Sequence, residues 1–497
     1  MPPIVAAFFC CVGIIGIFWL DRDHKSRTSP ALWIASAWFL LACSRSLSGW
    51  LNIRQSSVGS ITDQLSEGSP MDMGVLTGLL FLGVIVLLKR RERVARVLRH
   101  SAPILLFFSY CLISLVWSDY PAVAFKRWNK AIGDWVMILI VWTDPQPITA
   151  LKRLLARTTY TLIPLSILFI KYYPGLGRGY GRWSGLAVYY GVTTDKNALG
   201  AICLLFGLAS VWQVFNLFSD DERQNVQRRR HLIVQVVILA MILWLFSIID
   251  AMTSLSCFLL ASCLLFAIRC RMFVRSRFMV HCLVLVTVLI PVSVTLLGFS
   301  PDTLQTMGRN PTLTERTDIW AMVITLVPNR WVGAGYESFW LGPRLEAMIS
   351  NVTRWWVPNQ SHNGYLEIFA NLGWLGVGCL ALVIFWGYHR VIRAWRQKLP
   401  ASNLMLAYFV TGVIFNLTEA AFFRMMIPVW MFFLLAITFP QAVRNPRHEN
   451  RPAGPNRVAK LEKPLSPASG EIETANVTNS DWTGVSSITW ASGYGSS

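Results

Sequence analysis

The stretch LIVQVVILAMILWLFSIIDAMTSLSCFLLASCLLFAI, residues 232–268, decides the fold. It contains two long apolar runs, 232–249 and 252–268, and Asp250 is the only strong polar break between them. A helix of roughly 20 mostly apolar residues is long enough to cross a lipid bilayer. The stretch therefore predicts two spanning helices joined by a short turn.

Similar apolar runs recur along most of the chain. The 497 residues are 54% hydrophobic and only 14% charged, whereas soluble domains contain about 25% charged residues. The composition therefore predicts an all-α polytopic membrane protein with about 12–13 transmembrane helices. Thirteen candidate spans lie at 4–20, 31–50, 73–88, 102–117, 132–148, 158–173, 197–217, 232–249, 252–268, 279–299, 366–388, 404–421 and 425–440.

The positions of the basic residues predict which loops face the cytoplasm. Thirteen spans make the loops alternate between sides, and six short loops on one side together hold 24 of the 45 Lys and Arg residues. The C-terminal tail on that side holds 6 more, which leaves 15 for the other side. Cytoplasmic loops are rich in Lys and Arg, so this side is expected to be cytoplasmic. The net charge of +19 then needs no nucleic-acid partner.

The alternation divides the chain into four parts. We expect an N-terminal bundle of about ten transmembrane helices (1–299), a large periplasmic loop of short helices (300–365), C-terminal transmembrane helices (366–440) and a disordered cytoplasmic tail (441–497). The N-terminus has no basic segment before 4–20, so no cleaved signal peptide is expected. None of the ten cysteines lies in 300–365, so no disulfide framework is expected there.

One histidine stands apart from the others. Of the seven, only His362 is placed on the outer side by this topology, in SHNGYLEIFANLGWLG (361–376), where the chain re-enters the membrane. Histidine is well suited to accept a proton near neutral pH. A solvated loop histidine is the plain alternative, but Asn363 and Glu367 beside it favour a functional site.

The outer loop also contains a candidate anion-binding arginine. TLTERTDIWAMVITLV (312–327) has helical spacing of apolar residues and predicts an amphipathic helix at the membrane surface. Arg316 lies in its first turn, where the helix dipole disfavours a cation unless an anion binds there. Gly335 and Tyr336 follow in a turn whose backbone can approach a ligand closely.

Further polar residues are expected at the same outer surface. An intramembrane carboxylate is costly and needs a partner, so Glu419, near the outer end of 404–421, is expected to pair with Arg424 or with an outer lysine. Together these residues predict a basic site at the membrane surface that suits the pyrophosphate of a lipid headgroup. Its remaining cationic and amide candidates are Lys196, Asn197, Arg178, Arg182, Lys126, Arg127 and Lys130.

Several motifs resemble one family. LTERTDIW, VGAGYESFW (332–340) and SHNGYLEIFANLGWLG resemble the O-antigen ligase and polysaccharide polymerase superfamily, and most closely its exopolysaccharide-production (ExoQ-type) branch. DKNALG (195–200) and NLTEAAF resemble two further segments of that family, so the resemblance covers roughly residues 100–425 in the right order.

The resemblance implies a membrane glycosyltransferase of the bacterial inner membrane. Its donor is expected to be an undecaprenyl-pyrophosphate-linked oligosaccharide, and its second substrate is expected to be a glycan acceptor. Its expected partners are membrane lipid and polysaccharide export or chain-length proteins. The family's essential histidine corresponds to His362, as the base, and its loop arginine corresponds to Arg316, as the clamp on the leaving pyrophosphate. Neither a cofactor nor a metal is expected, and no nucleic acid.

Two positions depart from the family pattern. Glu315 stands where the family usually has Gly before the arginine, and Met252 stands where ligases often have a basic residue. The resemblance favours a polymerase, and a ligase that transfers the glycan to lipid A core is the alternative. A transporter or flippase is disfavoured because no internal repeat is visible, and a non-catalytic scaffold would leave the outer histidine unexplained.

Overall fold

The computed structural model describes residues 1–22, 27–52, 69–181, 185–219, 225–270, 277–297, 312–353 and 357–439. These residues are almost entirely helical, and their one sheet is an antiparallel hairpin of β1 (Arg178–Tyr180) and β2 (Ala187–Tyr189), with Arg178 opposite Tyr189. The predicted tail, 441–497, lies outside the described residues.

The helices of the N-terminal half are α1 (Pro3–Leu20), α2 (Leu32–Ala42), α3 (Leu47–Trp50), α5 (Pro70–Lys89), α6 (Arg91–Arg99), α7 (Ala102–Ile113), the 3-10 helix η1 (Ser114–Trp117), α8 (Pro121–Trp142), α9 (Pro147–Tyr172), α10 (Pro174–Gly177) and α11 (Lys196–Ser219). Those of the C-terminal half are α12 (Asn225–Ile248), α13 (Met252–Ala267), α15 (Arg277–Leu297), α17 (Thr312–Leu326), α18 (Gly342–Met348), the π-helix η2 (Ile349–Thr353), α19 (Gly364–Arg396), α20 (Ser402–Phe415) and α21 (Pro428–Thr438).

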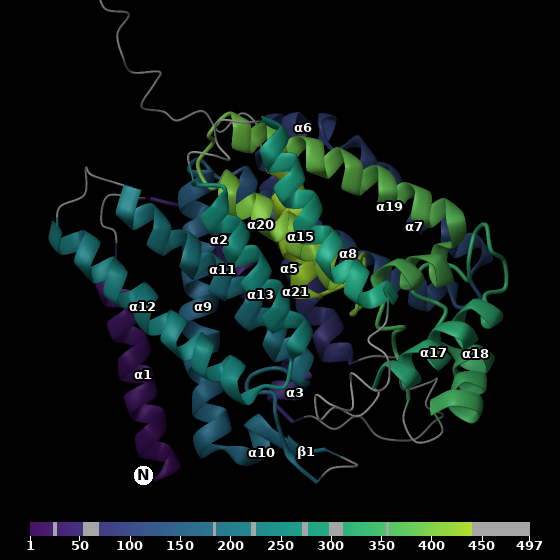
Figure 1. The fold of residues 1–497 in the computed structure, drawn as a ribbon, viewed down its shortest axis with the longest axis horizontal. Coiled ribbons are helices and arrows are strands. Elements are labelled where there is room, and N and C mark those ends of the chain that lie inside the picture. The colour runs from purple at the N-terminus through teal and green to yellow at the C-terminus, as the bar shows by residue number, and fades with distance from the viewer. Residues whose placement is uncertain are drawn as a thin grey trace, which may run out of the picture. The chain divides into compact units, whose positions relative to one another are not determined.

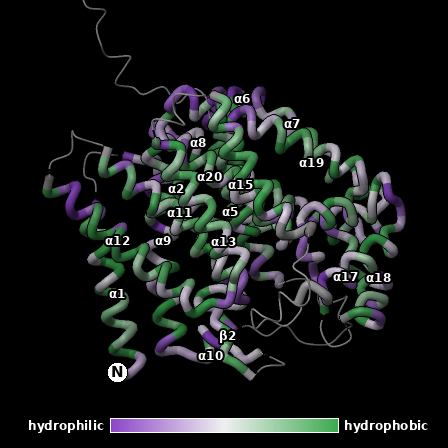
Figure 2. The backbone as a smooth tube through the Cα atoms, in the orientation of Figure 1, coloured by the Kyte–Doolittle hydropathy of each residue, from purple (hydrophilic) through white to green (hydrophobic). Residues whose placement is uncertain are grey.

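The helix pattern confirms an all-α polytopic membrane protein. Every one of the thirteen apolar stretches contains a helix. Within the described residues, α1, α5, α9, α11, α12 and α19 are long and apolar enough to cross a membrane, and α6 with α7 and η1 forms a bent pair that makes a seventh. Five shorter apolar helices, α2, α13, α15, α20 and α21, complete the hydrophobic set. Figure 2 shows hydrophobic residues along the long helices and hydrophilic residues around α6.

The centre of the bundle is formed by α11, α20 and α21. All eleven residues of α21 are buried, and α20 packs against both α21 and α13. By contrast, α1 and α5 bury few of their apolar side chains, and Phe8, Phe9, Phe81, Leu82 and Leu88 are among those that they expose. Because an apolar surface this large is unstable in water, we expect these two helices to face lipid. Figure 1 shows α1 beside α12, away from the centre of the bundle.

Several spans end earlier than hydrophobicity alone predicts. The stretch 404–421 stops being helical after Phe415, because the Asn416 side chain accepts hydrogen bonds from the backbone N–H groups of Ala421 and Phe422. The stretch 31–50 is divided between α2 and α3. In the same way 132–148 ends at Trp142, and the Asp144 carboxylate accepts a bond from the N–H of Gln146 in the turn that follows.

Contacts between loops agree with the predicted alternation of sides. Residues in the outer loops or at the outer ends of the predicted spans meet in the pairs Asn197–Glu419, Arg127–Glu337, Arg344–Asp119 and Thr253–Thr418. Loops assigned to the inner side meet in the pairs Ser29–Asp144, Arg153–Thr28 and Arg390–His100. The two sets of loops therefore gather at different ends of the helices.

The described part of the large loop forms short helices, and it packs on protein. On α17 the side chains of Ile319 and Val323 are buried against Phe339, Trp340 and Ala370. The prediction of a helix over 312–327 is confirmed to within one residue. The Ile319 and Val323 side chains of its apolar face, however, pack on the loop and on α19, whereas Ile324 is 47% exposed.

A kink in α19 fixes the loop to the bundle. Gly373 has φ +62° and ψ −165°, which breaks the helix, and the N–H groups of Trp374 and Leu375 donate to the carbonyls of Arg330 and Trp331. A Cβ at Gly373 would lie 2.3 Å from the Trp331 carbonyl carbon. The backbone of the large loop therefore occupies the space that only glycine leaves open.

This contact gives a first prediction. Gly373→Ala is expected to lower the free energy of unfolding by about 3 kcal/mol, since it adds a steric clash and a left-handed backbone penalty. The measurement is the melting temperature of the protein purified in detergent. Gly378→Ala is the matched control, because that position on the same helix has open space around it. Equal melting temperatures for the two variants would contradict this account of the kink.

Candidate functional site

His362 lies directly before α19 and is held by the start of that helix. The Asn363 side chain caps the helix by accepting hydrogen bonds from the N–H groups of Tyr365 and Leu366, at 3.0 and 3.1 Å. His362 itself has φ +51°, a conformation that histidine adopts more readily than most residues. The local backbone thus turns the imidazole away from α19 and toward the turn that follows α20.

Glu419 is the centre of the site. It lies in the turn after α20 and is only 6% exposed. Its Oε2 is 3.1 Å from His362 Nδ1, and its Oε1 is 3.3 Å from Arg316 Nη2 and 3.1 Å from Asn197 Nδ2. Three segments distant in the sequence therefore meet on one buried carboxylate.

Arg316 is held in the first turn of α17 by two acceptors. Its Nη1 donates to the Thr418 carbonyl at 2.8 Å, and its Nη2 faces Glu419. The side chain is 26% exposed. A guanidinium has five N–H donors, so donors remain on Arg316 for an anion from outside.

Asn197 reaches the site from the start of α11, and Lys196 precedes it in the sequence. The Asp195 carboxylate accepts hydrogen bonds from the N–H groups of Asn197 and Ala198, both at 2.9 Å, and so fixes the first turn. Asn197 then bonds Glu419, whereas Lys196 forms a 3.0 Å ion pair with Asp250. Because both members of that pair are well exposed, it is weak and can exchange for another anion.

The arrangement at His362 suits proton transfer. Within the described part of the chain its side-chain contacts use Nδ1, to Glu419 and at 3.5 Å to Gln360. A carboxylate on Nδ1 favours the tautomer with the proton on that nitrogen and leaves the lone pair on Nε2. The imidazole is 21% exposed, so a substrate can reach Nε2.

A second ion pair lies next to this cluster. Arg424, predicted as a partner of Glu419, instead pairs with Glu337 at 3.6 Å and donates to the Gln360 side chain at 2.8 Å. Arg127 also faces Glu337 and donates to its carbonyl. Neither Gln360 nor Glu337 was predicted from the sequence, although the acidic residue inside the stretch GAGYESFW (333–340) was a usable signal.

Four predicted site residues make contacts that hold the loop in place. Glu367 accepts from the Trp340 indole at 2.6 Å and from the Ser361 hydroxyl at 2.9 Å. Asn363 is the helix cap described above, and Gly335, at φ +90°, packs against Ser118. The Tyr336 hydroxyl donates to the Phe423 carbonyl at 2.6 Å, and burial raises its pKa well above the usual value. These contacts occupy the polar groups that were predicted to bind substrate.

Of the two predicted arginines in the Gly-rich segment, Arg178 makes its contacts away from Glu419. Arg178 lies in β1, donates to the Ile170 carbonyl and covers the Tyr189 ring. Arg182 lies outside the described residues, as does the side chain of Glu315. The described site thus consists of His362, Arg316, Asn197 and Glu419, with Lys196 beside them.

Comparison with known proteins supports the motif assignment. Residues 236–381 match the O-antigen ligase family, and a search of curated proteins found no match. The matched segment contains Arg316 and His362, while Asn197 and Glu419 lie outside it and join the same cluster in space. Residues 236–381 are therefore similar to the O-antigen ligase family, and they belong to a chain with several helices that are long and apolar enough to cross a membrane.

Proposed function

We propose that the protein is a membrane glycosyltransferase of the polysaccharide polymerase type. It transfers a glycan from an undecaprenyl-pyrophosphate carrier to a carrier-linked glycan acceptor at the periplasmic face of the inner membrane. The observation that supports this most directly is the Glu419 carboxylate, which holds a candidate base, His362, beside a candidate phosphate clamp, Arg316.

The proposed reaction assigns one role to each side chain. The acceptor hydroxyl oxygen forms a bond to the anomeric carbon while the bond from that carbon to the pyrophosphate oxygen breaks. The hydroxyl proton passes to His362 Nε2, and the electron pair leaves with the pyrophosphate. Arg316, with Lys196, neutralises the charge that grows on the leaving oxygen. Glu419 and Asn197 position these groups and do not touch the reacting atoms.

The placement of the site on the periplasmic face rests on charge distribution. His362, Arg316, Glu419 and Asn197 all belong to loops at the end opposite the basic loops, and basic loops face the cytoplasm. The site would then bind the carrier-linked glycan on the outer side of the membrane.

The experiment that tests the function is carrier-lipid analysis in cells that lack the protein and in cells with the His362→Ala or Arg316→Ala form. A polymerase predicts that single repeat units accumulate on the carrier and secreted polymer disappears, with protein abundance unchanged. Accumulation of full-length polymer on the carrier, with bare lipopolysaccharide, would instead identify a ligase. If neither glycan changes, the proposed function is wrong and transport becomes the better hypothesis.

A further inference from the structure

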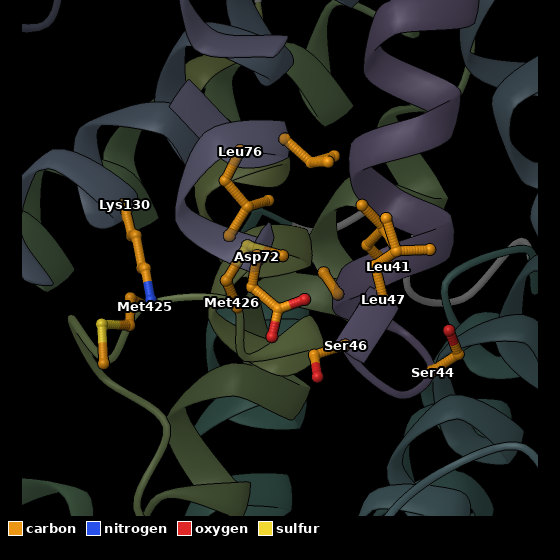
Figure 3. A pocket seen from close by; sticks show the side chains of 11 residues that line it. Leu41, Ser44, Ser46, Leu47, Asp72, Leu76, Lys130, Met425 and Met426 are labelled. Atoms are coloured by element: carbon orange, nitrogen blue, oxygen red, sulfur yellow. The ribbon is translucent and has the colours of Figure 1, made fainter. Parts of the chain in front are cut away.

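A groove lies between α5 and α8, apart from the His362 cluster. It consists of two adjoining cavities of about 240 and 340 Å³, which share Leu76, Lys130 and Met425. Figure 3 shows the smaller cavity, into which Lys130 of α8 and Asp72 of α5 both project. We call the two cavities the α5–α8 groove. Its use is not explained by the reaction proposed above.

The α5–α8 groove has an excess of positive charge. Lys126, Arg127 and Lys130 line the larger cavity, and Asp72 lines the smaller one. Lys126 and Lys130 are four residues apart and so lie on one face of α8. Among the described residues neither lysine forms a hydrogen bond or an ion pair within 4 Å. Asp72 is bonded by the Ser48 N–H at 2.8 Å, and its charge also attracts Lys130 without an ion pair within 4 Å. Both lysines therefore keep N–H donors for an anion.

The walls of the α5–α8 groove are apolar and reach the lipid-facing surface. Met73 of α5 and Phe125 of α8 line the larger cavity, and they are 45% and 48% exposed. They continue into the exposed face of α5, where Phe81 and Leu82 are 65% and 48% exposed. Cations in a groove whose apolar wall continues into an exposed apolar helix face complement a molecule with an anionic head and an apolar tail.

The α5–α8 groove is joined to the candidate base by a chain of polar contacts. Arg127, in the wall of the groove, faces Glu337, and Glu337 pairs with Arg424 at 3.6 Å. Arg424 donates to Gln360 at 2.8 Å, and the amide nitrogen of Gln360 is 3.5 Å from His362 Nδ1. A ligand in the groove therefore borders the same network that surrounds the reacting groups.

We propose that the α5–α8 groove binds the phosphate headgroup and first tail segment of the lipid that carries the acceptor glycan. This rests on the proposed function, which requires two glycan substrates to meet at His362. Donor and acceptor carriers then occupy different sites: Arg316 and Lys196 receive the pyrophosphate that leaves, and Lys126 and Lys130 hold the phosphate that stays attached to the growing chain.

Photo-crosslinking with peptide mapping tests the assignment. The full-length protein in detergent is exposed to a polyprenyl pyrophosphate with a diazirine in the first part of its tail. We expect labelling of α5 and α8 around Met73 and Phe125, and this labelling should fall at least about tenfold in the Lys126→Gln/Lys130→Gln variant. The matched control is Lys89→Gln, an exposed lysine at the other end of α5 that lines neither cavity, and it should label like wild type.

Competition distinguishes the sources of the phosphate. Unlabelled polyprenyl pyrophosphate should abolish labelling of the α5–α8 groove, whereas inorganic pyrophosphate and phosphatidylglycerol vesicles at the same concentration should not. Effective competition by pyrophosphate alone, or by phosphatidylglycerol, would overturn the assignment to a carrier lipid. Equal labelling of the double variant and of Lys89→Gln would overturn the site itself. Since labelling is read without turnover, it is independent of whether polymer forms, and thus of the proposed function.

Discussion

Replacing His362 with asparagine is expected to reduce glycan transfer at least about 100-fold, because the acceptor hydroxyl then has no base to take its proton. Asparagine tolerates the positive φ of this position and can still bond the Glu419 carboxylate, so the fold should be kept. The measurement is polymer formation per folded protein, by carrier-lipid analysis beside the melting temperature. His362→Ala should give the same loss of transfer.

His389→Ala provides the control for this prediction. His389 is an exposed histidine on α19, 27 residues from His362 and outside the cluster, and its removal should leave polymer formation unchanged. A His362→Asn protein that is folded and makes polymer at the normal rate would exclude this imidazole as the base. In that case the hydroxyl must lose its proton by another route, and the role assigned to the Glu419–His362 pair would be wrong.

The sequence was sufficient for the fold class because hydrophobicity along the chain is a strong signal. Each apolar run that is long enough to span a membrane contains a helix. The ends of the helices were less predictable, because they depend on particular side-chain contacts. Asn416 illustrates this, since its bonds to the N–H groups of Ala421 and Phe422 end the helical region that hydrophobicity alone extends to residue 421.

For the site, the sequence indicated candidate residues but not which of them lie together. Polarity at a membrane boundary identified His362, Arg316, Asn197 and Glu419 separately, and only the fold shows that they meet. The same criterion also selected Glu367, whose carboxylate is bonded inside the loop. Spacing along one chain cannot distinguish a polar group that faces a substrate from one that holds the backbone of a loop.

Gly335 in the large loop shows that a glycine in the sequence does not distinguish ligand binding from close packing within the chain. Gly335 was predicted to allow a ligand to approach the backbone. In the structure the close approach is made by Ser118, whose Cβ would be 2.6 Å from a Cβ at Gly335. A glycine indicates that another group packs closely against the backbone. That group can be a second segment of the same chain as well as a substrate.

Replacing Glu419 should separate its contribution to stability from its role in positioning His362. Glu419→Ala leaves Arg316 and His362 without their shared acceptor and is expected to lower the free energy of unfolding by about 2 kcal/mol, a value reduced from that of a fully buried pair because Arg316 is partly exposed. Glu419→Gln keeps the size and one carbonyl acceptor, so its cost should be about 1 kcal/mol. Melting temperatures in detergent measure both values.

Glycan transfer should not follow that order of stability. The neutral amide of Glu419→Gln does not fix the proton on His362 Nδ1 as a carboxylate does, so transfer is expected to fall about 100-fold or more although the protein remains folded. Glu346→Gln, an exposed glutamate on α18, serves as the control and should behave like wild type. If Glu419→Gln retains normal transfer, Glu419 only holds the turn after α20 in place, and the proton on His362 must be positioned by another group, of which Gln360 is the nearest described.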